Sequence, residues 1–222
     1  MASHIDTEKA AVEATHPSRA FKTHPPSRIG DAGALGLFSF ASTTFILSWY
    51  NTQIRDITVP DVVIGMAVAA GGLAQLLAGM WEFPRGNAFA GTAFSSYGAF
   101  WISYAIIILP GSGIINAYPS VKEFYSAIGI YLMTWFMVTF FFFIAALRKN
   151  VGFILMFFFL FVTFIFLGAG AFAGSVPVTK AGGALGIVTA LVAYYNGLSI
   201  LLASEENPII RLPLGVISKR ID

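Results

Sequence analysis

The chain has 222 residues, of which 57% are apolar and only 11% are charged, whereas ordinary globular chains carry about 25% charged residues. So few charges cannot cover a water-facing surface, and we expect lipid to surround most of the chain. The net charge of +2 argues against nucleic-acid binding. The chain has no Cys, and its only histidines are His4, His16 and His24, which excludes thiolate sites and removes imidazole from the membrane segments.

Charged residues divide the chain into long apolar stretches. Residues 1–30 are polar and mixed in charge, and we expect them to form a disordered tail. The following stretches can each cross a bilayer core of about 30 Å as a helix, and none alternates as a barrel strand does. We therefore predict an all-α integral membrane bundle of six transmembrane helices, near residues 32–51, 62–81, 88–109, 124–147, 151–173 and 182–203. They form a pore domain over 31–204, and a C-terminal tail covers 205–222.

Six spans place both termini on one side of the membrane. Ten of the 13 Lys and Arg residues fall on that side, and three fall on the other, namely Arg55, Lys122 and Lys180. The loops alone divide three against three, so the two tails decide the topology. The positive-inside rule then predicts cytoplasmic termini.

Six helices without an inserted soluble domain leave three classes: a channel or transporter, an intramembrane enzyme, and a sensor or scaffold. Intramembrane catalysis needs His, Asp or Glu at span depth. Asp31, Asp61 and Glu82 lie only at the predicted span ends. We therefore expect no catalytic residue, no metal and no cofactor.

Uncharged polar residues cluster in the first and third predicted helices. A single Ser or Thr in such a helix usually bonds to the preceding turn or joins two helices, but a cluster can also line a path for a small anion. Small residues, including Gly79 in the second helix and Gly183 in the sixth, predict close helix packing. The segment 81–87 predicts a two-helix corner in which Glu82 pairs with Arg85, and a pore mouth is an equal interpretation.

That corner begins a resemblance to a known family. The stretch Gly79-Met-Trp-Glu-Phe-Pro-Arg-Gly-Asn-Ala-Phe-Ala-Gly-Thr-Ala-Phe-Ser-Ser-Tyr-Gly-Ala-Phe-Trp101 resembles the signature of the acetate uptake transporter family, which joins fungal acetate permeases and ammonia-export proteins to bacterial succinate–acetate permeases. Residues 35–51, 180–186 together with 194–196, and 212–215 extend the similarity, and the polar N-terminal tail is typical of a fungal member. One departure is Asp31-Ala-Gly-Ala34, which stands where the family has an Asn and two Pro residues. Asp31 can still cap a helix, but it adds negative charge near the expected anion entrance.

The resemblance implies a ring of six subunits, each with its own pore. The family's hydrophobic constriction maps onto Phe40, Tyr97 and Leu160, the last by counting from Tyr131 through a Phe-rich stretch. The implied polar residues of the path are Thr43, Thr44, Gln75, Asn87, Thr92 and Ser96. The implied residues of the mouth and corner are Asp31, Asn51, Glu82 and Arg85.

The resemblance predicts a plasma-membrane permease or channel for acetate and similar short carboxylates, with the lipid bilayer and further copies of the chain as partners. A path without an ionisable group at mid-depth favours passage of the anion, or of the anion with a proton taken from water, over a carrier that protonates itself. Two alternatives stay open. One is an ammonium or ammonia exporter, because aromatic faces also suit cations. The other is a non-transporting acetate sensor, to which Asp31 and the missing prolines point.

Overall fold

The structure, a computed structural model, describes residues 29–217, so most of the predicted N-terminal tail and the end of the predicted C-terminal tail lie outside the described residues. The elements are, in chain order, α2 (Gly33–Asn51), η1 (Ile54–Asp56), α3 (Val63–Val68), η2 (Ala69–Ala74), α4 (Gln75–Glu82), α5 (Ala88–Ile108), η3 (Ile115–Ala117), α6 (Val121–Ala146), α7 (Val151–Ala173) and α8 (Val176–Ala203). Within 29–217 the only β pairing is an isolated bridge between Asn150 and Val216. The all-helical architecture that the sequence predicts is confirmed.

All six predicted helices are present, but two of them begin earlier than predicted. The fourth, α6, starts at Val121 because the Ser120 side chain accepts a hydrogen bond from the Glu123 amide at 3.2 Å and so caps the helix. The sixth, α8, starts at Val176 with a proline in its first turn, where proline is well tolerated. The prediction ends each span at a charged residue, but a helix can continue past such a residue, and Lys122 and Lys180 lie inside α6 and α8.

The second helix is continuous from Val63 to Glu82 but changes its winding in the middle. Residues Ala69–Ala74 form the π-helical element η2 between α3 and α4. A methyl group built on Gly71 would lie 2.7 Å from both Thr43 Oγ1 and a ring carbon of Trp101. The wider turn therefore stands where this helix packs closely against side chains of both α2 and α5, and π-helical turns are frequent at functional sites.

Five helical segments of the described chain are long and apolar enough to cross a membrane, judged by length and composition: Val63–Glu82, α5, α6, α7 and α8. Helix α2 has 19 residues and is long enough, but hydroxyl residues such as Ser39, Thr43 and Ser48 make it less apolar. These three side chains are buried. The polar residues of α2 therefore face other helices rather than lipid.

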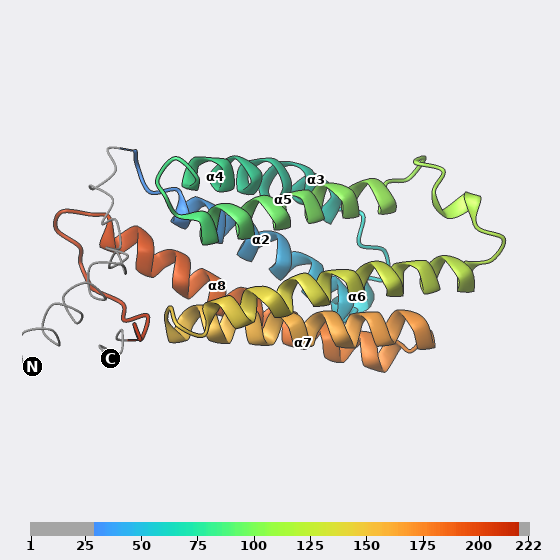
Figure 1. Ribbon diagram of the computed structural model, residues 1–222. Helices are drawn as coiled ribbons and strands as arrows, with labels where there is room; N and C mark the ends of the chain where they lie inside the picture. Colours follow the sequence, from blue (N-terminus) through green and yellow to red (C-terminus); the bar gives the residue numbers. More distant parts are fainter. Residues whose placement is uncertain (1–28, 218–222) are drawn as a thin grey trace, which may run out of the picture. The chain divides into compact units, whose positions relative to one another are not determined.

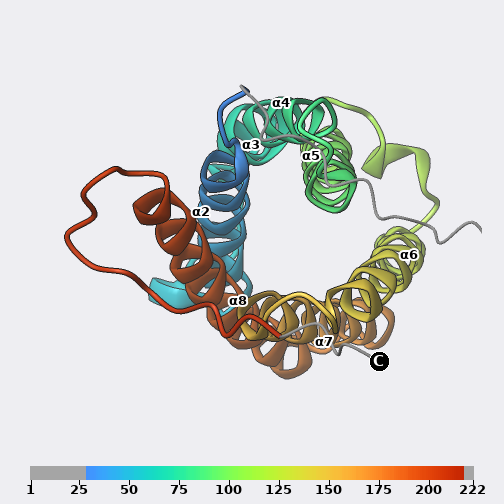
Figure 2. The same ribbon diagram turned by 60° about the vertical axis from the view of Figure 1, so that its left-hand side comes forward.

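The helices run side by side along the molecule (Figure 1) and follow one another around a common axis (Figure 2). Helix α4 packs on α5, α2 on α8, and α7 on both α6 and α8. Helices α5 and α6 meet through side chains, since the rings of Phe100 and Tyr131 have centroids 5.8 Å apart. We call the end with the start of α2, the end of α8 and the corners 83–87 and 147–150 the terminal end. The opposite end, with segments 52–62, 109–120 and 174–175, is the loop end.

Glycines permit the closest helix contacts, as the small-residue pattern predicts. A methyl group built on Gly183 of α8 would lie 2.8 Å from the Ser48 carbonyl oxygen and 2.9 Å from the Thr52 amide nitrogen of the α2 end. Both neighbours are backbone atoms that cannot rotate away. Gly65 of α3 differs, because nothing lies within 4 Å of such a methyl group. The contact between α2 and α8 therefore depends on the absence of a side chain at residue 183.

We predict that Gly183→Ala lowers the thermal unfolding midpoint of the purified protein in detergent, because the added methyl group must push α2 and α8 apart at a cost of about 1–3 kcal/mol. Gly65→Ala is the matched control, since it makes the same substitution in a helix with open space around it and is expected to leave the midpoint unchanged or slightly higher. Equal midpoints for the two variants would contradict the prediction.

Candidate functional site

A cavity of about 780 Å³ opens at the loop end and extends into the helix bundle. Its walls come from α2, α5, α6, α7 and α8, and its rim from the loop-end segments. Apolar and aromatic residues make up most of the wall, and helix residues with hydroxyl groups also line it, including Thr44, Ser48, Thr163 and Thr179. We call this space the large cavity. Its size suits a small solute with several waters, because typical ligand pockets measure about 300–1,000 Å³.

The three residues placed at the constriction come together on the wall of the large cavity. Phe40 of α2, Tyr97 of α5 and Leu160 of α7 all line it, and they are exposed by only 4%, 2% and 3% respectively. The rings of Phe40 and Tyr97 have centroids 5.4 Å apart. The Tyr97 hydroxyl forms a 2.9 Å hydrogen bond with Thr139 Oγ1 of α6, so its ring is held from two sides.

A much smaller space of about 20 Å³ shares two of these residues. Phe40 and Tyr97 line it together with Gln75 and apolar residues that include Phe89 and Phe157. We call it the small pocket, and it has room for about one water molecule. Gln75 is completely buried, and neither its amide oxygen nor its amide nitrogen has a hydrogen-bond partner among residues 29–217. Such a buried amide is costly unless something binds to it, so Gln75 marks a polar position beside Phe40 and Tyr97.

The other polar candidates divide into two groups. Thr44 and Asn51 line the large cavity. Thr43, Asn87, Thr92 and Ser96 line neither space. The Thr43 hydroxyl donates to the Ser39 carbonyl at 3.0 Å, and the exposed Thr92 donates to the Ala88 carbonyl at 2.7 Å. Thr92 and Tyr97 are five residues apart on one helix, which turns their side chains about 140° from each other.

Sequence reasoning missed several residues of the large cavity. Phe100, Trp101 and Tyr104 line it from the next turns of α5. Trp101 Nε1 and Thr44 Oγ1 are buried and have no hydrogen-bond partner in the described part of the chain. The helical spacing from Tyr97 to Trp101 and Tyr104 is the signal that could have identified them, because residues four and seven positions apart share a helix face.

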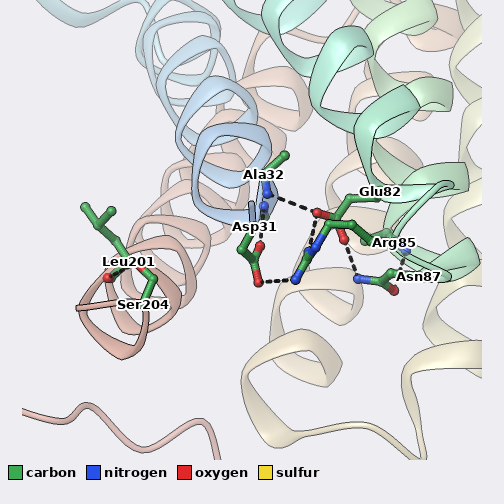
Figure 3. A network of polar contacts seen from close by, with 9 residues as sticks. Asp31, Ala32, Glu82, Arg85, Asn87, Leu201 and Ser204 are labelled. Carbon is green, nitrogen blue, oxygen red and sulfur yellow. Dashed lines mark hydrogen bonds and ion pairs between the residues drawn. The ribbon is translucent and has the colours of Figure 1, made fainter. Parts of the chain in front are cut away.

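A polar network joins the start of α2 to the corner between α4 and α5 (Figure 3). The Glu82 carboxylate is completely buried and accepts hydrogen bonds from Arg85 Nη1 at 2.6 Å, Asn87 Nδ2 at 2.7 Å and the Ala32 amide at 3.1 Å. Arg85 also contacts Asp31 Oδ2 at 3.0 Å. The expected pair of Glu82 with Arg85 is therefore present, and the same guanidinium reaches Asp31.

One guanidinium, that of Arg85, serves both carboxylates of this network. Burial alone would lower the pKa of Arg85, but its hydrogen bond to Glu82 and the attraction of Asp31 outweigh that effect and raise the pKa. Asp31 Oδ1 also accepts the Gly33 amide at 2.7 Å and so caps the first turn of α2. The negative charge of Asp31 is thus paired with Arg85 at the helix start.

Comparison with known proteins places this chain in a family. A sequence profile described as the GPR1/FUN34/yaaH family matches residues 13–218. The chain belongs to this family. Acetate permease A of Emericella nidulans is 39% identical over 96% of this chain and 76% of its own length. Ammonia transport outward protein 2 of Saccharomyces cerevisiae is 39% identical over 87% of this chain and 69% of its own length.

A solved structure supports the same assignment. The structure of the bacterial acetate channel SatP matches with a TM-score of 0.75 and 29% identity, covering 84% of this chain and all of that one. Together with the five apolar helices of membrane-spanning length, the match shows a multi-pass membrane protein whose relatives include an acetate permease and an acetate channel.

We predict that Glu82→Gln lowers the free energy of unfolding by about 1–3 kcal/mol, because it removes the carboxylate that holds Ala32, Arg85 and Asn87 together. Asp31→Asn is the control, since it removes the partly exposed partner of the same Arg85 and should cost less than about 1 kcal/mol. Unfolding of both variants in detergent micelles tests this. An equal loss in both would show that the outer pair, rather than the buried carboxylate, stabilises the corner.

Proposed function

We propose that the protein is a plasma-membrane permease or channel for acetate and other short monocarboxylates, and that it acts by transport rather than catalysis. The observation that carries this proposal is that Phe40, Tyr97 and Leu160 line the large cavity, and that Phe40 and Tyr97 also line the small pocket with Gln75, which has no hydrogen-bond partner among residues 29–217. The names of acetate permease A and of the SatP channel supply the solute class.

The hydrogen-bonding groups near the constriction suit a weakly held anion. Thr44 Oγ1 and Trp101 Nε1 belong to residues of the large cavity, Gln75 Nε2 belongs to a residue of the small pocket, and all three lack partners in the described chain. A carboxylate accepts hydrogen bonds from such donors. None of the three carries a charge, so they lack the strong attraction that would slow release. Their atoms are buried, so an anion reaches them only when the neighbouring side chains move.

The chemistry of the solute explains how a proton can accompany it. A short carboxylic acid titrates near the pKa of Asp and Glu side chains, about 4, so both forms exist in a mildly acidic medium and the neutral cytoplasm retains the anion. The residues placed at the constriction include no carboxylate, histidine or lysine. A proton that crosses with the solute is therefore taken up in water at one end and released at the other.

We further propose cytoplasmic termini, because ten of the 13 Lys and Arg residues lie on the terminal side.

We also propose a ring of six subunits with one pore in each. In the apolar stretch of α6 that is long enough to span a membrane, only 17% is buried within the chain. Much of the surface of α6 is therefore left for lipid or a neighbouring subunit. Cross-linking and mass determination in mild detergent test the subunit number.

The decisive experiment measures uptake of labelled acetate into liposomes that contain the purified protein. We expect uptake above that of empty liposomes, and a clear loss when a larger side chain replaces Phe40, as in Phe40→Trp. Absence of acetate uptake by protein that elutes like a native oligomer would overturn the proposal and favour a sensor.

We predict that Phe40→Ala and Tyr97→Ala raise the uptake of longer-chain acids relative to acetate severalfold, because each removes a ring from the constriction. Phe38→Ala is the matched control. Phe38 is also an aromatic residue of α2, but it lines neither the large cavity nor the small pocket. Its ring packs on Tyr194 instead, with the two centroids 6.3 Å apart. Uptake ratios of butyrate to acetate measure the effect, and unchanged ratios in both constriction variants would remove these residues from the path.

Ammonium is the second candidate solute, favoured by the relative named ammonia transport outward protein 2. Imposing an ammonium gradient across the same liposomes separates the two. Flux that follows the ammonium gradient and ignores labelled acetate would replace the carboxylate proposal.

A further inference from the structure

The side chain of Lys149 lies over an aromatic ring near the small pocket. Its Nζ atom is 4.2 Å from the centroid of the Phe89 ring. Lys149 belongs to the corner between α6 and α7, whereas Phe89 belongs to the first turn of α5. This contact therefore joins α5 to the α6–α7 pair at the terminal end. Its geometry is that of a cation–π interaction, in which an ammonium group meets the negative face of a ring.

The ring of Phe89 connects Lys149 to the residues at the constriction. Phe89 lines the small pocket, and its centroid lies 5.9 Å from that of Phe157 and 6.0 Å from that of Phe142. Those two rings in turn contact Tyr97, at 6.4 Å and 5.8 Å. Continuous ring contacts thus extend from the ammonium group to Tyr97.

The charge of Lys149 is not matched by an acid in the described chain. Arg85, at the same end, is paired with both Asp31 and Glu82. No carboxylate within residues 29–217 lies within ion-pair distance of Lys149, whose recorded side-chain contact is the Phe89 ring. An aromatic face is a weaker partner for an ammonium group than a carboxylate is. A solute carboxylate can therefore displace the ring.

The backbone around Lys149 is held in place by the C-terminal segment. The Lys149 carbonyl accepts the Ile217 amide at 3.1 Å, and the Val151 and Gly152 amides donate to the carbonyls of Gly215 and Leu214. The Phe153 amide donates to the Asn150 side chain. The first amide groups of α7 are therefore already occupied, which leaves the side-chain cations of Arg148 and Lys149 for an anion at this corner. Arg148 is exposed, whereas Lys149 lies over the ring that borders the small pocket.

We propose that Lys149 binds the solute carboxylate at the terminal end of the path, and that the Phe89 ring competes with the carboxylate for the same ammonium group. This inference rests on the proposed transport of short carboxylates. When the anion takes the ammonium, Phe89 loses its charged partner and is free to rotate beside the small pocket. Lys149 thus both recruits the anion and releases the ring.

The first test compares three variants in liposomes with acetate added on the side of the terminal end. Protease added outside the liposomes removes only outward-facing N-terminal tags, and so measures the fraction of protein with its terminal end outward. Lys149→Met is expected to raise the acetate concentration for half-maximal uptake by about two- to fivefold, the scale of one exposed charge contact. Arg148→Met, which removes the neighbouring exposed charge, should change it little. Lys149→Arg keeps the cation and should restore the wild-type value.

The second test uses the competition itself. Phe89→Leu keeps an apolar side chain but removes the ring face, so it should lower the half-maximal acetate concentration while Lys149 is present. The same change in the Lys149→Met background should have no such effect. A merely structural contact would weaken uptake in both backgrounds, which would overturn the proposal. If Lys149→Met does not give a native oligomer, Phe89→Leu alone is the test. A lower half-maximal acetate concentration supports the proposal, and a higher one contradicts it.

The outcomes separate this inference from the proposed function. Wild-type uptake of acetate with equal effects of Lys149→Met and Arg148→Met would overturn the role of Lys149 and leave the permease intact. No wild-type uptake of acetate would overturn the permease and the role of Lys149 with it.

Discussion

The buried carboxylate of Glu82 sets the geometry of the terminal end. It lies where a helix ends at the membrane surface, and an unpaired charge there would cost several kcal/mol. Arg85, Asn87 and the Ala32 amide satisfy it, and in doing so they join the beginning of α2 to the beginning of α5. These two helices carry Phe40 and Tyr97. By holding the starts of both helices together, the network fixes how far each ring lies from the terminal end.

Helix geometry then brings the rings to one level. Phe40 lies about 12 Å along its helix from Ala32, and Tyr97 lies about 15 Å from Asn87 at 1.5 Å per residue. Leu160 is also about 15 Å from Asn150, which caps α7 at the same end. Three side chains far apart in the sequence therefore lie at similar distances, about 12–15 Å, from the terminal ends of their helices. The register of the helices at the terminal end sets the level of the three residues that we expect at the constriction.

The positions of the helices could be predicted from the sequence more fully than the directions of their side chains. Charged residues and turn signals located all six helices, because the bilayer requires long uncharged stretches, and the match of the signature segment placed Tyr97. Helix phase was harder to predict. Thr92 and Ser96 belong to the same signature as Tyr97, yet they line neither space, since neighbouring residues on a helix point in different directions. The π-helical turn at Ala69–Ala74 lies against α2 and α5, and local sequence does not contain such contacts. The early start of α8 does have a local signal, the proline in its first turn.

The same contacts change the interpretation of the acidic residue at the start of α2. An unpaired Asp31 would repel an arriving anion, but its contacts with Arg85 and the Gly33 amide use its charge within the protein. At the terminal end Arg85 lies between Asp31 and Glu82, while Lys149 lies over the Phe89 ring. At the constriction an anion meets aromatic and aliphatic side chains, and the Tyr97 hydroxyl is occupied by Thr139. Removing water from an anion there is costly.

Glu82 joins the starts of α2 and α5. Rotation of the Phe40 and Tyr97 side chains therefore disturbs less of the structure than separation of the two helices would. The passage of an anion is best explained by movement of these two rings.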